Sequence, residues 1–294
     1  MLVPTNQHLS PAGHQLYFPG RPTDLALSPD RSLLAVKNME NILIIKMEDR
    51  TILQTLPVEK GGQGFTGIAF APDGKSIYTT DSEGRVCVAG LVAKGIFAWE
   101  DPIVLPGPAA PGTADPAKFP SSPGGLALDP AGRELWVTLS RNNTLGRVDL
   151  KSRRLTQIPV GMAPYGVVLG PGTKAYVSNW AGRRPRSGES VADSSGSPVL
   201  INPKNGVAAS GTVSVVDTRT RREISTIEVE LHPNGMTLNA DRSRLFVANA
   251  NSDTVSVIDT STDRVMEVIS VLPEQSRPFG SACCGAIVTK ATGS

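Results

Sequence analysis

The sequence predicts an all-β fold, a β-propeller of four-stranded antiparallel blades, and three observations support this prediction. A block of strand, turn and strand recurs along the chain with a period of about 40 to 45 residues, the length of a propeller blade. Glycine and proline are frequent, at 29 and 24 of 294 residues, which favours many short strands joined by turns. Apolar and small polar residues alternate along the clearest segments, as they do in half-buried strands.

Each block begins with a lead segment, a few residues rich in proline or glycine that run directly into an apolar strand. The expected first strands, with their lead segments, are residues 21–27, 64–70, 122–128, 163–169 and 232–238. Four of them share a glycine at the fourth position, and these are Gly67, Gly125, Gly166 and Gly235. First strands lie nearest the propeller axis, where backbones crowd, so we interpret the glycines as packing positions and not as a cradle for phosphate.

A turn rich in proline, aspartate and glycine follows each first strand, because proline presets φ while glycine and aspartate tolerate tight positions. The turns are residues 28–31, 71–74, 129–132, 170–173 and 239–242. Second strands are expected at residues 33–36, 77–80, 135–138, 175–178 and 245–248. We interpret Asn179, Asn249 and Asn251 as turn formers that close the hairpin between the second and third strands.

Third and fourth strands are clearest in the last two blocks. Third strands are expected at residues 212–217 and 254–259, and fourth strands at residues 223–227 and 265–269. Four strands in a unit of this length make one propeller blade. A single blade cannot bury both of its faces, so neighbouring blades are expected to stack their apolar faces.

The repeats divide the chain into an N-terminal leader, residues 1–19, and a propeller, residues 20–294, with insertions near residues 102–120 and 181–210. The second insertion is rich in serine, glycine and arginine, and is expected to be a mobile or loosely packed loop outside the blade core. Another lead segment begins at Arg277, and the pattern then breaks. The sequence therefore predicts five complete blades and a sixth that is begun, with truncation or a frameshifted end as the explanation.

Charge and reactive residues exclude several classes of function. The net charge of +2 provides no long-range field toward nucleic acid or an anionic membrane. Three cysteines and three widely spaced histidines, His8, His14 and His232, form no disulfide framework and no recognisable zinc site. We expect no metal, no cofactor and no catalytic group. The first residues have no basic region and the chain has no long apolar run, so we expect neither a signal peptide nor a membrane span within this sequence. An export signal, if the protein is exported, is expected outside it.

The candidate ligand-binding residues are Asp24, Trp180, Arg183, Arg184, Arg186 and His232. An aromatic residue beside three arginines can stack on a nucleotide base and bind its phosphate. In the alternative interpretation, Trp180 packs beneath the insertion while the arginines stay in water. Asp24 and His232 lie near the ends of strands, where they either face the central channel or act as turn and cap residues.

Two pairs of segments resemble a known family. Residues 245–259 and 175–179 resemble the "YVTN" repeats of YncE-like and surface-layer β-propellers. Residues 19–30 and 178–185 are similar to bacterial proteins in which a YncE-type propeller precedes an alkaline-phosphatase-like phosphoesterase domain. The resemblance covers residues 1–281 and implies the propeller half, in a periplasmic or secreted protein with that phosphoesterase domain as a partner. The metal-binding Asp, His and Thr residues of the phosphoesterase have no matching positions here.

Two classes of function follow. The preferred one is a non-catalytic binding or scaffold module, whose partner is a small molecule, a protein or, with less support, single-stranded nucleic acid. The alternative is a propeller hydrolase of the lactonase type that acts on a small molecule at the central channel. That activity needs a metal or an acid and base pair, so metal analysis of the purified chain separates the two classes. We expect the chain by itself to have no phosphoesterase activity.

Overall fold

The computed structural model describes residues 13–58, 62–108 and 120–272, and in these ranges every regular element is a β-strand. The strands form five four-stranded antiparallel sheets and one two-stranded hairpin. Each four-stranded sheet is one blade, and in each the strands pair in chain order. The prediction of an all-β propeller with five consecutive blades is confirmed. The predicted start of a sixth blade lies outside the described residues.

The blades have the following bounds. Blade 1 contains β1 (Pro22–Leu27), β2 (Leu33–Asn38), β3 (Asn41–Lys46) and β4 (Thr51–Pro57). Blade 2 contains β5 (Gln63–Phe70), β6 (Ser76–Asp81), β7 (Arg85–Ala93) and β8 (Ile96–Val104). Blade 3 contains β9 (Pro123–Leu128), β10 (Glu134–Leu139), β11 (Thr144–Asp149) and β12 (Leu155–Pro159). Blade 4 contains β13 (Pro164–Leu169), β14 (Lys174–Asn179), β17 (Gly211–Asp217) and β18 (Arg222–Val229). Blade 5 contains β19 (Pro233–Leu238), β20 (Arg244–Asn249), β21 (Thr254–Asp259) and β22 (Arg264–Ser270), and the hairpin is β15 (Val191–Ser194) with β16 (Ser197–Leu200).

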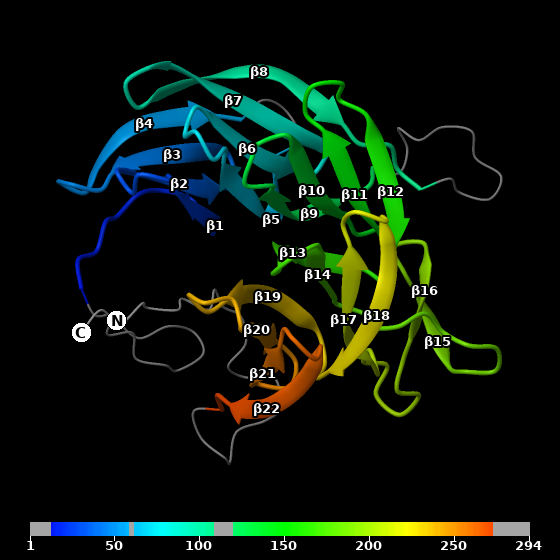
Figure 1. Cartoon of the computed structure of the whole chain (residues 1–294). Helices are drawn as coiled ribbons and strands as arrows, with labels where there is room; N and C mark the ends of the chain where they lie inside the picture. The colour runs from blue at the N-terminus through cyan, green and yellow to red at the C-terminus, as the bar shows by residue number, and fades with distance from the viewer. Residues whose placement is uncertain (1–12, 59–61, 109–119, 273–294) are drawn as a thin grey trace.

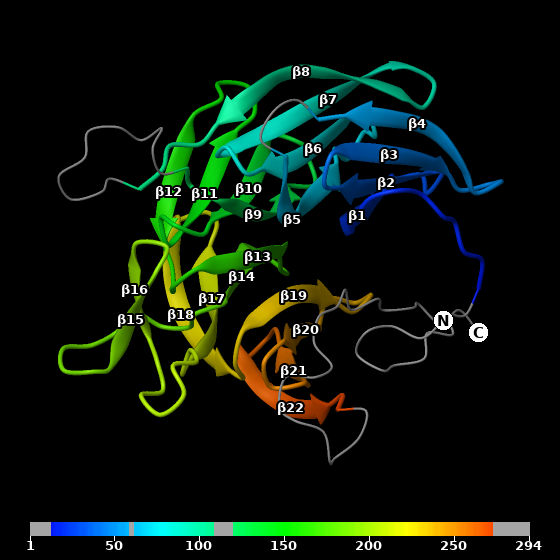
Figure 2. The same ribbon diagram turned by 180° about the vertical axis from the view of Figure 1, so that it is seen from behind.

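The blades follow one another around an arc, with each first strand on the inside and each fourth strand on the outside (Figures 1 and 2). The first strands β1, β5, β9, β13 and β19 pack side by side in that order. We call the side on which the first strands begin the front face, and the opposite side the back face. Second strands end on the front face, since Pro164 pairs with Asn179 and Pro233 pairs with Asn249.

Apolar side chains fill the interface between consecutive blades, which we call a seam. The first seam joins Ile42 and Ile44 of blade 1 to Ile68 and Phe97 of blade 2, and all four side chains are buried. Equivalent clusters fill the second, third and fourth seams. Since each blade has one apolar face toward each neighbour, stacking stabilises sheets that could not bury those faces alone.

Polar groups add a second kind of contact at the seams. The Thr138 hydroxyl donates to the carbonyl oxygen of Tyr165 in the next blade at 3.0 Å, and the Ser178 hydroxyl donates to that of Asn234 at 2.7 Å. The packing role of the lead-segment glycines is also visible here. A β-carbon added to Gly67 would lie 2.2 Å from the carbonyl oxygen of Gly124, so no larger residue fits between these two blades.

The two outermost faces of the arc are more exposed than the same positions inside a seam. Leu25 of blade 1 is 56% exposed, whereas Ile68, its equivalent in blade 2, is 7% exposed. Ile269 of blade 5 is 39% exposed, whereas Ile227 of blade 4 is 6% exposed. Part of the outer face of blade 1 is covered by the leader, whose residues Leu16 and Phe18 pack against the buried cluster of Val36, Leu43 and Ile45.

The first insertion differs in part from its prediction. Strand β8 runs through Pro102 to Val104, so some of the extra length of this unit lies in a long β7–β8 hairpin whose strands have nine residues each. Residues 109–119 lie outside the described ranges. The composition of the segment predicts only a loop, because Pro102 interrupts its apolar residues. The strand nevertheless continues through Pro102, since an outermost strand tolerates a proline.

The second insertion lies outside the four-stranded blades, as expected, but part of it is a β-hairpin and not a loop. Strands β15 and β16 pair through a two-residue turn, Ser195-Gly196, in which both residues have positive φ, at 54° and 86°. These values fit the type I′ turn that matches the twist of a hairpin. Val199 packs with the buried residues Met162 and Ala181 in a small core of its own. The serine and glycine content of the insertion is typical of a loop, so composition did not predict the hairpin.

Of the three asparagines expected to form turns, Asn251 does lie in the turn between β20 and β21, whereas the other two have a different role. Asn179 and Asn249 are the last residues of β14 and β20, and both side chains are buried. The Asn249 amide donates to Ser256 Oγ at 2.9 Å and to Thr254 Oγ1 at 3.1 Å, and Asn179 makes the same contacts with Ser214 and Thr212. They join two neighbouring strands through side chains. In the turns between the second and third strands of blades 3 and 5, the residues with positive φ are Asn143 and Asp253, each of which directly precedes the third strand of its blade.

Candidate recognition surface on the front face

Trp180 and His232 lie in contact at the front end of the fourth seam. Their ring centroids are 4.5 Å apart with an angle of 33° between the planes. Trp180 directly follows β14 of blade 4, and His232 directly precedes β19 of blade 5. The indole is 43% exposed, so one part of it packs on the imidazole while another part faces solvent.

The backbone explains why the two rings meet. His232 has a φ of 54°, and Ser122 and Ala163, which also begin lead segments, have φ values of 48° and 50°. The left-handed conformation thus recurs at the start of the lead segments of blades 3, 4 and 5, and histidine tolerates it better than bulky or β-branched residues do. Partial burial lowers the pKa of His232, and a hydrogen bond with Asn251 opposes that shift. The imidazole is therefore neutral at pH 7.

The three arginines of the insertion have different partners. Arg183 forms a two-pronged ion pair with Glu189, with nitrogen to oxygen distances of 2.9 and 2.5 Å. This pair, together with the backbone N–H of Arg186, lowers the pKa of Glu189 to about 2. Arg184 donates to the backbone oxygen of Asn143 at 3.1 Å, and the side chains of Arg184 and Arg186 are exposed. Trp180, Arg184 and Arg186 thus share the front face, while Arg183 stabilises the insertion.

Asn143, which was not predicted as a functional residue, anchors the insertion to blade 3. Its side-chain amide donates to Ser197 Oγ at 2.8 Å, and its side-chain oxygen accepts from the backbone N–H of Ala163 at 2.8 Å. Its backbone oxygen accepts from Arg184. The side chain is buried, and the residue has a φ of 53°, a conformation that asparagine adopts more readily than most residues. An Asn-Asn pair after a second strand is the only sequence signal for this role.

Asp24 is separate from this group and lies at the first seam. One carboxylate oxygen accepts from the backbone N–H of Leu25 at 2.8 Å, and the other accepts from Thr66 Oγ1 at 2.9 Å and from the backbone N–H of Gly67 at 2.7 Å. Asp24 also lines a central cavity of about 470 Å³ together with Tyr165. It occupies the lead-segment position that is glycine in the other blades, and it binds the next blade through hydrogen bonds.

A second aromatic group on the front face was not predicted from the sequence. The Phe65 side chain is 67% exposed, and the guanidinium carbon of Arg21 lies 5.9 Å from the centre of its ring. Both residues belong to lead segments, of blades 2 and 1. An exposed aromatic ring with a cation over its face therefore lies at the front of the first seam, as the Trp180 and His232 rings do at the fourth.

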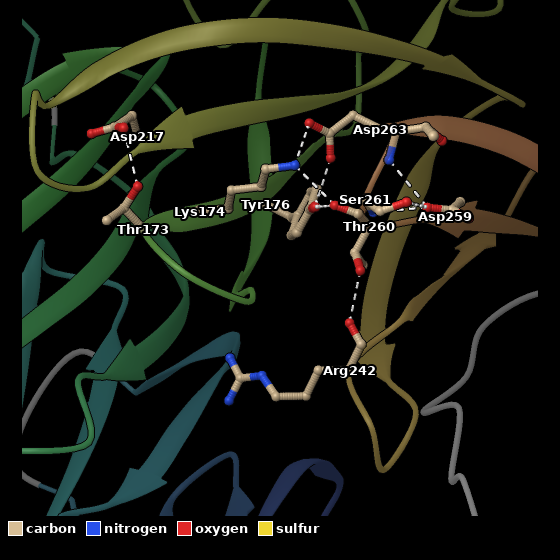
Figure 3. Close-up of polar contacts among 10 residues, drawn as sticks. Thr173, Lys174, Tyr176, Asp217, Arg242, Asp259, Thr260, Ser261 and Asp263 are labelled. Atoms are coloured by element: carbon tan, nitrogen blue, oxygen red, sulfur yellow. Dashed lines mark hydrogen bonds and ion pairs between the residues drawn. The ribbon is translucent and has the colours of Figure 1, made fainter.

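A polar cluster on the back face holds the fourth seam together (Figure 3). Lys174 Nζ lies 2.7 Å from Asp263 Oδ2, and the Tyr176 hydroxyl donates to Asp263 Oδ1 at 2.7 Å. Lys174 also donates to the backbone oxygen of Thr260 at 2.9 Å. Burial and the neighbouring Asp263 carboxylate raise the pKa of Tyr176. The cluster joins β14 to the turn between β21 and β22. Lys174, Tyr176 and Asp263 bind one another there, so we interpret the cluster as structural.

Within the described ranges, no group of three or more His, Cys, Asp or Glu side chains is arranged to hold a metal ion. In the same part of the chain, no helix could cross a membrane.

Neither a protein-family model nor a curated protein matches the sequence. Solved structures do match its fold. Hydrazine synthase of Kuenenia stuttgartiensis has a TM-score of 0.58 and 15% sequence identity, over 86% of this chain and 67% of that chain. Dihydro-heme d1 dehydrogenase NirN, in complex with DHE, has a TM-score of 0.55 and 16% identity, over 85% of this chain and 47% of that chain. The WD40 repeats of RRP9 have a TM-score of 0.60 and 15% identity, over 88% of this chain and 65% of that chain.

These comparisons and the five described blades define the chain as a β-propeller module of four-stranded blades. The chain spans 47% to 67% of the length of these three neighbours. At identities of 15% and 16% the likeness concerns the fold alone.

Proposed function

We propose that this chain is a non-catalytic binding or scaffold propeller whose recognition surface is the front face. The observation that carries the proposal is the exposed Trp180 indole, supported from one side by His232 and placed beside the anchored insertion. Large aromatic side chains held in place contribute area at little entropic cost, which is why they dominate recognition surfaces.

Two exposed aromatic groups at two seams favour a ligand with an extended chain over a compact one. Phe65 lies at the first seam and Trp180 at the fourth, so the lead segments of blades 3 and 4 lie between them. Arg21, Arg184 and Arg186 add positive charge to the same face, which fits a partner with acidic or phosphate groups. Arg183 and Asp24 support the surface through the contacts described above.

The wider setting is part of the same proposal. The YVTN-like segments at residues 175–179 and 245–259 support a YncE-like propeller. The similarity of residues 19–30 and 178–185 supports an exported protein, periplasmic or secreted, in which the propeller is joined to a phosphoesterase domain. In that setting the module holds a partner or substrate near an active site contributed by the other domain. A front face with aromatic and arginine side chains is suited to this task.

Selection of peptides tests the location of the surface. A phage library of random twelve-residue peptides is selected on the wild-type chain, and the selected peptides are measured against Trp180→Ala, Phe65→Ser and the back-face control Leu91→Ser. We expect at least a tenfold loss of affinity with each front-face variant and no loss with Leu91→Ser, whose side chain is also exposed. Peptides that tolerate both front-face variants but lose binding to Leu91→Ser contradict the proposal. ATP and a twelve-nucleotide oligothymidylate, measured in parallel, distinguish nucleotide from peptide recognition.

A further inference from the structure

Lys37 is a completely buried lysine that lies at the first seam. It belongs to β2 of blade 1. Its Nζ atom donates to the backbone oxygens of Thr66 and Thr80 at 2.7 Å, to that of Gly67 at 3.1 Å and to Thr80 Oγ1 at 3.0 Å. All four acceptors belong to blade 2. An ammonium group has three protons to share among them, so these oxygens replace its hydration shell.

This lysine departs from the repeat. The equivalent positions of blades 2, 3 and 4 are Thr80, Thr138 and Ser178, and two of these hydroxyls donate to a backbone oxygen of the following blade. A hydroxyl makes that contact without a charge. At this position of the second strand, only the first of the described seams has an ionisable group, at the cost of removing an ammonium from water.

The charged and titratable groups around Lys37 come from three strands. Asp24 on β1 binds Thr66 and Gly67, the same residues that accept from Lys37. Asp81 at the end of β6 pairs with Arg85 at the start of β7. Cys87, also on β7, has a pKa raised to about 12, mainly by burial, so it is a neutral thiol. The hydrogen bonds of Lys37 go to carbonyl and hydroxyl oxygens, and the two carboxylates act on it from farther away.

We propose that Lys37 makes the seam between blades 1 and 2 a proton-sensitive joint. The closed seam removes the lysine from water, and this burial disfavours the charged form more than the surrounding oxygens and carboxylates favour it. Opening the seam returns the side chain to water, where it binds a proton over the whole physiological range. Proton uptake and seam opening are therefore linked, and the seam opens more readily as the pH falls toward neutrality.

The pKa gives the pH window and its sign. Burial lowers the pKa of Lys37 to about 7, against the attraction of Asp24 and Asp81, while a lysine in water has a pKa of 10.5. Between these values the open state binds more protons than the closed state, so the equilibrium constant for opening falls about tenfold per pH unit as the pH rises. Below pH 7 both states are protonated and the dependence ends.

The joint lies next to functional elements. Thr66 and Gly67, which accept from Lys37, also line the central cavity. Phe65, the exposed aromatic residue of the front face, directly precedes them. Opening of this seam therefore changes the geometry at one end of the proposed recognition surface, a consequence that rests on the proposed function, whereas the joint itself does not.

The test measures the Nζ titration directly by 15N nuclear magnetic resonance, with the Lys37 signal assigned through its loss in Lys37→Gln. We expect a midpoint at least two pH units below that of the other lysines. A midpoint near 10 overturns the proposal. Lys37→Gln keeps donors at this position without a charge, and Lys37→Thr places there the residue of blades 2 and 3, so at least one of them should fold.

The linkage is tested by hydrogen exchange of the Thr80 and Gly67 amides between pH 6 and 9, corrected for the intrinsic exchange rate. We expect the wild-type opening constant to fall by more than tenfold over this range and that of Lys37→Gln to stay level. Ser178→Ala, at the fourth seam, is the matched control and should keep the pH dependence of the wild type. Equal pH dependence in the wild type and in Lys37→Gln contradicts the joint. None of these readouts depends on ligand binding, so they remain decisive if the proposed function fails.

Discussion

At the scale of single residues, the last position of each second strand determines how a blade closes on its front face. In blades 4 and 5 this position is asparagine, and its amide bridges a threonine and a serine on the third strand. In blade 3 it is Leu139, and the residue that corresponds to the serine is Gly146. Blades 3, 4 and 5 therefore contain two solutions for this site, a polar one and an apolar one, and in each the partner residue matches. In blades 1 and 2 the position is Asn38 and Asp81, which have other partners.

This comparison predicts the outcome of exchanging one solution for the other. Asn249→Leu should cost about 1 to 3 kcal/mol, because Ser256 and Thr254 lose a buried partner. Adding Ser256→Gly should recover part of that loss, since the pair then matches Leu139 and Gly146 of blade 3. Urea denaturation of the two single variants and the double variant measures the coupling. Strictly additive effects would show that the two residues do not act as a pair.

His232 provides a second prediction at this scale. Its pKa is lowered by burial, so its contribution to stability is present above the unfolded value of about 6.5 and is lost as the pH falls below it. The protonated ring should also quench the fluorescence of the stacked Trp180. We expect quenching with a midpoint below pH 6.5 in the wild type and none in His232→Gln. Quenching that persists in His232→Gln would assign the titration to another group.

At the scale of elements, the insertion after β14 is an ordered hairpin, held by Asn143 and by a small apolar core. Its three arginines lie in a segment that is closely hydrogen-bonded, with Arg183 paired to Glu189. Trp180 directly precedes this anchored segment, and its indole contacts His232. The proposed recognition surface therefore includes an insertion that is fixed to blade 3.

Asn143→Gly tests this anchoring without straining the backbone, since glycine accepts a φ of 53°. The change removes the contacts with Ser197 and with the backbone of Ala163. Trypsin should then cleave after Arg183, Arg184 or Arg186 several times faster, while the blades remain folded by circular dichroism. Asn142→Gly, at the adjacent position, is the control. An unchanged cleavage rate in Asn143→Gly means that other contacts hold the insertion.

The strands that follow the repeat could be predicted from the sequence, but the segments that depart from the repeat could not. The expected strand at residues 254–259 agrees with β21, because five aligned copies mark each turn and each apolar run. The hairpin at residues 191–200 was missed, since its turn is Ser-Gly and its strands have only four residues each. Of the candidate site, Trp180 and His232 do meet, but Asp24 and Arg183 are engaged in structural contacts. Phe65 was missed because exposure depends on neighbouring blades and not on local pattern.

At the scale of the whole molecule, each blade depends on its neighbours, so the two ends of the arc have the greatest need of cover. The leader provides some at blade 1, where Leu16 and Phe18 pack on the buried cluster of its outer face. The exposed positions Leu25 and Leu27 lie on the same blade. The seams combine apolar clusters with backbone-directed donors, so they resist separation more than apolar stacking alone would.

Replacing Leu16 and Phe18 with serine should expose the cluster that they cover. Two lost apolar contacts of this size predict a loss of about 1 to 3 kcal/mol in unfolding free energy. The fluorescence of the apolar dye ANS should rise, because blade 1 then presents an uncovered face. Tyr17→Ser changes a neighbour that is 83% exposed and serves as the control. No change in either readout would show that the leader does not stabilise blade 1.

The most direct measurement of the central claim, recognition through the front face of a propeller, is hydroxyl-radical footprinting with and without a selected peptide. The readout is the rate of side-chain oxidation at Trp180 and Phe65 on the front face and at Met47 and Leu91 on the back face, all of which are exposed in the free chain. Recognition through the front face predicts at least a threefold protection of Trp180 and Phe65, with unchanged rates at Met47 and Leu91. Protection of Met47 and Leu91, with Trp180 and Phe65 still oxidised at their free rates, would place recognition on the back face instead.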